Sequence, residues 1–140
     1  MKRLGILIAD EDQSVRRCLR KSVERHLELE VRWEADNGLE ALLLARQEQP
    51  NAVIMDARLP RMDGLEVTRC LRAANNQVCI VLMSAYEEHR AEALAAGADA
   101  FVLKDACREA LNSTILQIVN CGNRAADAAT DAAKPDEDRL

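Results

Sequence analysis

The feature that most constrains the fold of this chain is a regular alternation of short apolar runs with longer segments of helical spacing. Strands that alternate with helices in this way predict a parallel sheet whose strands are joined by right-handed crossovers. The apolar runs have the length of strands, and there are five of them: Leu4–Ala9, Leu29–Trp33, Ala52–Met55, Val78–Met83 and Ala100–Leu103. We therefore expect an α/β domain of five β–α units, with five helices.

Helix boundaries are marked by residues that satisfy the exposed backbone groups of a helix end. Asn37 and Asp63 are each followed three residues later by a glutamate, Glu40 and Glu66, which is the spacing of a capping box. Gly97 lies where a fourth helix would end, and glycine readily adopts the left-handed conformation that closes many helices. These positions predict the starts of the second and third helices and the end of the fourth.

The helical pattern is lost beyond Gly122. Residues 123–140 are alanine, aspartate and other polar residues with Pro135, and no large aliphatic residue occurs before Leu140. Such a segment cannot bury enough apolar surface to offset the entropy lost on ordering. We therefore expect one ordered domain over residues 1–122, a size that a single hydrophobic core serves, followed by a disordered tail or linker over residues 123–140.

Charge and cysteine usage limit the partners and the compartment. The net charge of −5 excludes a basic field that would recruit nucleic acid or anionic lipid. No apolar run approaches the ~20 residues of a membrane span. The five cysteines are scattered without a C-x-x-C pair, which is typical of buried thiols in a reducing cytosol. We expect a cytoplasmic protein that binds neither membrane nor nucleic acid directly. His26 and His89 lack metal-ligand spacing and are expected on helix faces or the surface.

Polar side chains follow four of the expected strands. Asp10 and Glu11 come after the first, Asp56 after the third, Ser84 after the fourth and Lys104 after the fifth. Ligands of open α/β sheets bind at the carboxyl ends of the strands, so we expect these side chains to lie at one edge. Three carboxylates against one ammonium favour a hard divalent cation. Mg²⁺ suits such a site because it accepts one or two carboxylates together with water and phosphoryl oxygens.

An aspartate at the end of a buried strand can also act as a nucleophile, because carboxylates form aspartyl phosphates. Charge on a transferred phosphoryl group would be met by the cation and by Lys104, and Ser84 would donate a hydrogen bond. We therefore interpret Asp56 as a phosphate acceptor.

Five stretches, in this order and spacing, resemble the receiver domain of two-component response regulators: ILIADED with Arg16 following, ADNGLEAL, IMDARLPRMDG, VLMSAY and AGADAFVLKDA. The resemblance covers roughly residues 2–122. It implies a flavodoxin-like, doubly wound sheet of strand order 2-1-3-4-5. It also implies transfer of phosphate from a sensor histidine kinase to Asp56. Such a protein is not a turnover enzyme but a phosphoacceptor with self-catalysed phosphotransfer and slow autodephosphorylation.

The resemblance also implies a metal-binding set. Asp10, Glu11 and Asp56, with the backbone carbonyl of Arg58, take the positions of the Mg²⁺ ligands. Glu11 departs from the family, which usually has aspartate there. The additional methylene changes the reach by ~1.5 Å, whereas Mg²⁺ requires near-octahedral ligands at ~2.0–2.1 Å. Glu11 could bind directly, act through a water or weaken the site. Asp12 is a poorer substitute because its side chain leaves the strand in another direction.

Other roles follow by position. Lys104 takes the place of the lysine that contacts the phosphoryl group, and Ser84 and Phe101 take those of the switch residues. Arg58 and Tyr86 flank the phosphoryl group and would slow its hydrolysis. Lys104 is followed by aspartate where much of the family has proline, which resembles the branch whose receivers precede a helix-turn-helix output domain. The implied partners are a sensor histidine kinase, an output domain or target protein and, as an option, a second copy of the chain.

Two other functions compete with this interpretation. A degenerate receiver would bind partners without phosphorylation, and Glu11 is the feature that favours it. A haloacid dehalogenase-like phosphatase would use Asp10 and Asp12 in a D-x-D-x-[TS]-V motif, which Asp10–Val15 fits. Such phosphatases need a further acidic motif after the lysine, where this chain offers only Asp105.

Overall fold

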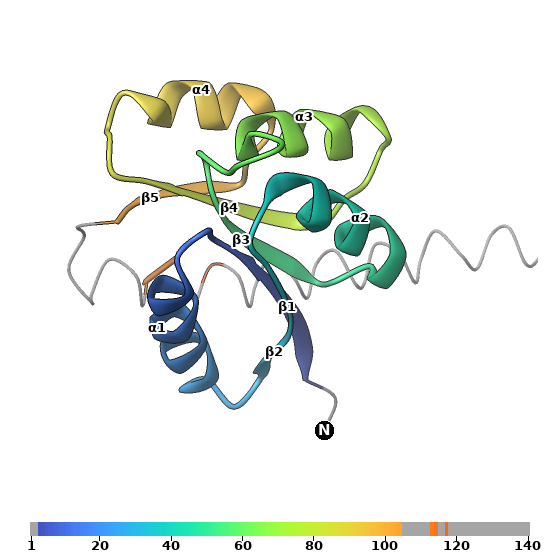
Figure 1. Ribbon diagram of the computed structural model, residues 1–140. Helices are drawn as coiled ribbons and strands as arrows, with labels where there is room; N and C mark the ends of the chain where they lie inside the picture. The colour runs from blue at the N-terminus through green and yellow to red at the C-terminus, as the bar shows by residue number, and fades with distance from the viewer. Residues whose placement is uncertain (1–2, 105–112, 115–116, 118–140) are drawn as a thin grey trace, which may run out of the picture.

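Five parallel strands form a single sheet of order β2-β1-β3-β4-β5 in the computed structural model, which describes residues 3–104, 113–114 and 117. Figure 1 shows the arrangement of the elements, whose bounds in chain order are β1 Leu4–Ala9, α1 Gln13–Glu24, β2 Leu29–Ala35, α2 Gly38–Glu48, β3 Ala52–Asp56, α3 Gly64–Ala73, β4 Cys79–Ser84, α4 His89–Ala96 and β5 Ala100–Leu103. The α/β fold class and the strand order are those expected. The fifth helix and the boundary at residue 122 lie outside the described residues.

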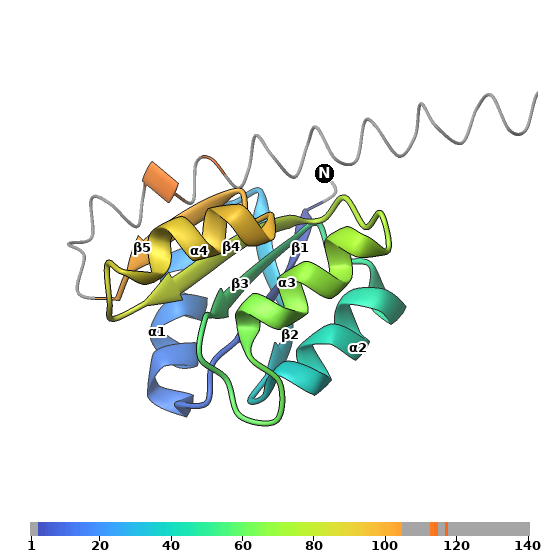
Figure 2. The ribbon, with the colours of Figure 1, turned by 90° about the horizontal axis from the view of Figure 1, so that it is seen from above.

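The helices cover both faces of the sheet, with α1 on one face and α2, α3 and α4 on the other (Figures 1 and 2). β1 shows how the sequence serves both layers. Leu7 and Ala9 belong to the core shared with α2, α3 and α4, whereas Ile6 and Ile8 belong to the core shared with α1. Strands buried on both faces are continuous aliphatic runs, because alternating polar residues would leave unpaired polar groups inside.

The strand boundaries agree closely with the apolar runs. β1 and β5 begin and end where expected, and β4 is shifted by one residue. β2 extends two residues further, to Ala35, because its pairing with β1 continues beyond a register shift between Ile6 and Leu7. The apolar run did not predict this extension, because β2 contains charged residues, which an edge strand tolerates.

In the part of the chain that the structure describes, three helices begin with a side-chain cap. Asn37 Oδ1 accepts the backbone N–H of Glu40 at 2.8 Å, as a capping box requires. Asp63 instead accepts the N–H of Leu65, at 3.1 Å. Asp12 caps α1 by accepting the N–H of Ser14 at 2.8 Å. Gly97 ends α4 with a φ of 112°, the left-handed conformation predicted for it.

The prediction of buried thiols is wrong for two cysteines. Cys18 is exposed on α1 and Cys70 is half-buried on α3, whereas Cys79 is buried in β4. Amphipathic helices place a cysteine on either face, so the apolar character of the residue did not decide its burial. Each helix in the described part of the chain is too short or too polar to span a bilayer.

Candidate functional site

The carboxyl ends of β1 and β3 bring two carboxylates to one cation. β1 and β3 pair with Ala9 opposite Met55, so Asp10 and Asp56 leave the sheet as neighbours. Lys104, directly after β5, reaches across: its Nζ lies 2.9 Å from Asp10 Oδ2 and 2.6 Å from Asp56 Oδ2. The side chain of Asp10 is 2% exposed and that of Asp56 is 13% exposed. The three residues therefore form an acidic site partly withdrawn from water.

The loop after β1 holds Asp10 in place. The N–H of Asp12 donates to Asp10 Oδ1 at 2.9 Å, so both carboxylate oxygens are engaged. Arg16, in the first turns of α1, donates from Nη1 to the carbonyl oxygens of Asp10 and Glu11 at 2.6 and 3.3 Å. Arg16 Nε also contacts Glu34 Oε1 on β2 at 3.1 Å. Arg16 was part of the sequence pattern without a role, and the structure shows that it ties the acidic loop to β2.

The loop after β3 holds Asp56. Its Oδ1 accepts the N–H of Arg58 at 3.0 Å, and the N–H of Ala57 donates to the carbonyl of Met83 at 2.7 Å. Gly64 packs directly beneath this loop, because a Cβ at that position would lie 2.2 Å from the carbonyl oxygen of Asp56. The Asp-Gly pair at the start of α3 is therefore required for this close approach as well as for the helix cap.

Burial and pairing act in opposite directions on the Lys104 ammonium. Burial is the largest single contribution and lowers the pKa of Lys104, because it disfavours the charged form. The hydrogen bonds and charges of Asp56 and Asp10 together outweigh it and raise the pKa of Lys104 above its ordinary value. The ammonium therefore stays charged at neutral pH.

Ser84 ends β4 beside this site, and its side chain is hydrogen-bonded to that of His89, which was expected on a helix face or the surface. Its Oγ lies 2.6 Å from Nδ1 of His89, the first residue of α4, and accepts the N–H of Tyr86 at 3.0 Å. The carbonyl of Ser84 accepts the N–H of Lys104 at 2.8 Å, which joins the ends of β4 and β5. No pattern in the sequence indicated that His89 contacts Ser84.

Phe101 lies in β5, with its side chain in the core shared with α2, α3 and α4. The guanidinium of Arg90 stands over its ring, 4.9 Å from the centroid. Phe101 is 7% exposed, so its side chain is a core residue in this structure.

The side chains of three predicted site residues make no hydrogen bond or ion pair with the cluster of Asp10, Asp56 and Lys104. Glu11 and Arg58 are exposed, and Tyr86 is 61% exposed. Across the residues that the structure describes, no group of three or more His, Cys, Asp or Glu is arranged to hold a metal ion. Two acids of the predicted set, Asp10 and Asp56, converge on Lys104, and the side chain of Glu11 is exposed. The roles assigned to these residues stay predictions.

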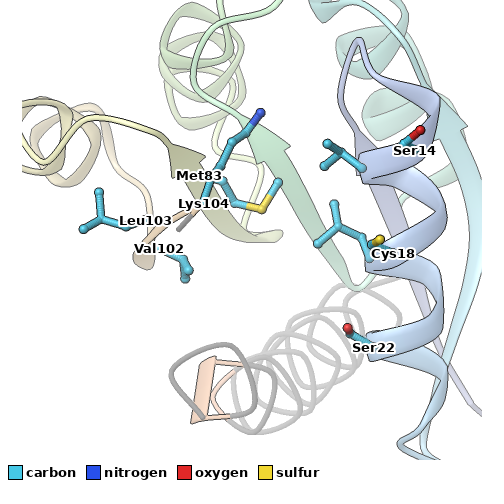
Figure 3. A pocket seen from close by; sticks show the side chains of 9 residues that line it. Ser14, Cys18, Ser22, Met83, Val102, Leu103 and Lys104 are labelled. Carbon is cyan, nitrogen blue, oxygen red and sulfur yellow. The ribbon is translucent and has the colours of Figure 1, made fainter. Parts of the chain in front are cut away.

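An apolar groove lies between α1 and the ends of β4 and β5, and Lys104 of the strand-end site is among the residues that line it (Figure 3). Its walls include Cys18 on α1 and Met83 and Val102 on the sheet. None of the residues that line the groove is a carboxylate, so the groove cannot supply the chemistry of the strand-end site.

Comparisons with known proteins agree with this geometry. The family model described as response regulator receiver domain matches residues 6–116. Response regulator MprA of Mycobacterium sp. (strain KMS) is 38% identical over 109 residues, which are 76% of this chain and 46% of that protein. The chain thus spans about half the length of the curated relatives it matches.

Solved structures give the same result. A DNA-binding response regulator of the LuxR family from Staphylococcus aureus is 28% identical with a TM-score of 0.76, over 82% of this chain and 98% of that chain. The chemotaxis response regulator CheY4 of Vibrio cholerae is 24% identical with a TM-score of 0.74, over 84% and 99% of the two chains, and shows the likeness of fold. The chain therefore belongs to the response regulator receiver domains of two-component signalling.

Proposed function

We propose that this receiver accepts a phosphoryl group on Asp56 from a sensor histidine kinase. The observation that carries the proposal is the bridge from Lys104 Nζ to Asp10 Oδ2 and Asp56 Oδ2, at 2.9 and 2.6 Å. A structural role alone would not place two carboxylates of low exposure at a single ammonium, because burying charge is costly. Asp56, 13% exposed in its side chain, keeps access to a donor.

The transfer itself is a displacement at phosphorus. A carboxylate oxygen of Asp56 attacks, a new P–O bond forms, and the bond from phosphorus to the donor breaks, with its electron pair leaving on the donor. With acetyl phosphate as donor, the products are the acyl phosphate and acetate, and no proton is gained or lost. Lys104 is placed to stabilise negative charge on the phosphoryl oxygens, and Ser84 to donate to one of them.

Mg²⁺ fits the donor set. Asp10 and Asp56 already converge on one cation, the Lys104 ammonium, and carboxylates are ligands that Mg²⁺ prefers. Asp10, Asp56 and the Arg58 carbonyl would hold it, with Glu11 binding directly or through a water. When bound, it supplies charge neutralisation for the incoming phosphoryl group.

The phosphorylated domain would act through an output domain or a separate target protein, with a homodimer as a further option. The relatives that match are about twice as long as the matched segment, and one solved neighbour is described as DNA-binding. We propose that the domain is cytoplasmic and that it is not a turnover enzyme. It would catalyse the transfer of a phosphoryl group from the donor to itself and lose that group slowly.

The test is direct labelling. Incubated with acetyl phosphate and Mg²⁺, the full chain should gain one phosphoryl group, seen by mass spectrometry and lost in alkali. Asp56→Asn should abolish the gain, and Asp36→Asn, an exposed aspartate on the loop before α2, should keep it. Labelling of Asp56→Asn at the wild-type level would refute the assignment.

A second candidate is a phosphorylation-independent binding module. The exposed side chain of Glu11 favours it, since this residue stands where the family supplies a metal ligand. A wild-type chain that stays unlabelled with Mg²⁺ while Glu11→Asp becomes labelled would establish that candidate. The phosphatase has no such support, because the family model that matches residues 6–116 is that of the receiver domain.

A further inference from the structure

The Ser84 hydroxyl already has partners before any phosphoryl group arrives. Ser84 is 2% exposed, and its Oγ accepts the N–H of Tyr86 at 3.0 Å and lies 2.6 Å from His89 Nδ1. The imidazole is itself held in position: the Tyr86 and His89 rings meet edge to face at 5.7 Å, and the N–H of His89 donates to the carbonyl of Tyr86 at 3.2 Å.

The chemistry of a hydroxyl decides what this contact means. Serine has one O–H proton to donate, and its oxygen also accepts. Because the Tyr86 N–H occupies an acceptor site of Oγ, the contact with His89 either uses the proton or adds a second donor. The second arrangement would leave the proton of a buried hydroxyl to find another acceptor, and an unsatisfied buried donor is costly. The neutral imidazole protonated on Nε2, with Nδ1 as acceptor, avoids that cost.

We propose that His89 is a positioning residue that accepts the Ser84 hydroxyl proton and so withholds it from a phosphoryl group on Asp56. This inference rests on the proposed phosphoacceptor function. Phosphorylation must then break the Ser84–His89 hydrogen bond before Ser84 donates to the phosphoryl group. His89 therefore slows phosphorylation and favours the unphosphorylated state. Because His89 is the first residue of α4, it also links the site to that helix.

Three substitutions separate the hydrogen bond from the size and the helix position of His89. In His89→Asn the terminal amide atoms are bonded to Cγ, as Nδ1 is, so the bond to Ser84 can be kept. In His89→Gln those atoms lie one bond further out, near the place of Nε2, and His89→Ala has none. With acetyl phosphate and Mg²⁺, we expect His89→Gln and His89→Ala to be phosphorylated about fivefold faster than wild type, which corresponds to about 1 kcal/mol. His89→Asn should stay near the wild-type rate.

Ser84→Ala provides the matched background. If His89 acts through the hydroxyl, His89→Ala should change the rate in the wild-type chain and have no effect in Ser84→Ala. Rates of His89→Ala and His89→Gln equal to or below wild type would overturn the inference, as would equal acceleration in the Ser84→Ala background.

Nitrogen-15 NMR shows which imidazole nitrogen of His89 carries the proton, and it does so without any phosphorylation. The inference requires an unprotonated Nδ1 at neutral pH, with a resonance that moves in Ser84→Ala, and a protonated Nδ1 overturns it. A labelled wild type with a protonated Nδ1 would refute only the role of His89. A wild type that gains no phosphoryl group would refute the proposed function, and this inference with it.

Discussion

Replacement of Lys104 by methionine tests whether the acidic site stores electrostatic repulsion. Both Oδ2 atoms accept hydrogen bonds from the Nζ of Lys104, at 2.9 and 2.6 Å, so the two Oδ2 atoms of Asp10 and Asp56 lie within about 5.5 Å of each other. At that distance two negative charges repel by ~3 kcal/mol at an effective dielectric constant of ~20, and by less than ~1 kcal/mol in bulk water. Because Asp56 is partly exposed, the repulsion between the two carboxylates should lie between these two limits. We therefore expect Lys104→Met to lower the free energy of unfolding by about 1–3 kcal/mol.

The direction in which a second substitution, Asp56→Asn, changes the stability makes the test specific. Asp56→Asn removes one of the repelling charges, so it should raise the stability of Lys104→Met. In the wild-type background it removes a partner of the ammonium and should lower stability or leave it unchanged. The measurement is urea unfolding at pH 7 and low salt with EDTA, followed by fluorescence of Trp33, the single tryptophan. Lys21→Met, an exposed lysine on α1, is the control for the substitution itself and should change stability by less than ~0.5 kcal/mol. Equal effects of Asp56→Asn in both backgrounds would refute the stored repulsion.

Three further outcomes are expected. Because the pKa of Lys104 is raised, its stabilising contribution is fully present below about pH 10 and is lost as the pH rises through the raised pKa. Thermal melting curves should therefore show that the stability difference between wild type and Lys104→Met becomes smaller above about pH 10. Gly64→Ala places a Cβ 2.2 Å from the Asp56 carbonyl and should destabilise the chain by at least ~1 kcal/mol in urea and slow labelling; a neutral effect would mean that the loop moves freely. Replacing both Arg58 and Tyr86 by alanine should speed loss of the phosphoryl group after donor removal by up to about tenfold, or ~1.4 kcal/mol, and unchanged decay would show that neither side chain shields it.

Much of the fold could be predicted because its signals are local. Both faces of the sheet are covered, so each strand is an aliphatic run that can be recognised without its neighbours, and β1 and β5 were located to the residue. The left-handed backbone at position 97 could likewise be predicted, because glycine readily adopts that conformation. β2 was underestimated because an edge strand carries charged residues, and its last two residues pair only through a register shift with β1.

The sequence by itself determined which residues reach the site edge. Strand ends follow from the apolar runs, and parallel strands bring their carboxyl ends to the same edge, so the positions of Asp10, Asp56, Ser84 and Lys104 could be predicted together. The strand order 2-1-3-4-5 came from resemblance to a family, since apolar runs show where strands lie and carry no record of which strands pair.

Only the tertiary structure decided which of these side chains meet. A side chain's direction depends on the loop that carries it and on the partners it finds there. The Arg16 bonds to two carbonyls hold the acidic loop with the Asp10 carboxylate inside and the Glu11 side chain exposed. The hydrogen bond between Ser84 and His89 joins the end of a strand to the start of a helix, and no pattern in the sequence couples those two positions. Its geometry depends on the turn between β4 and α4, which brings the first residue of the helix back to the last residue of the strand.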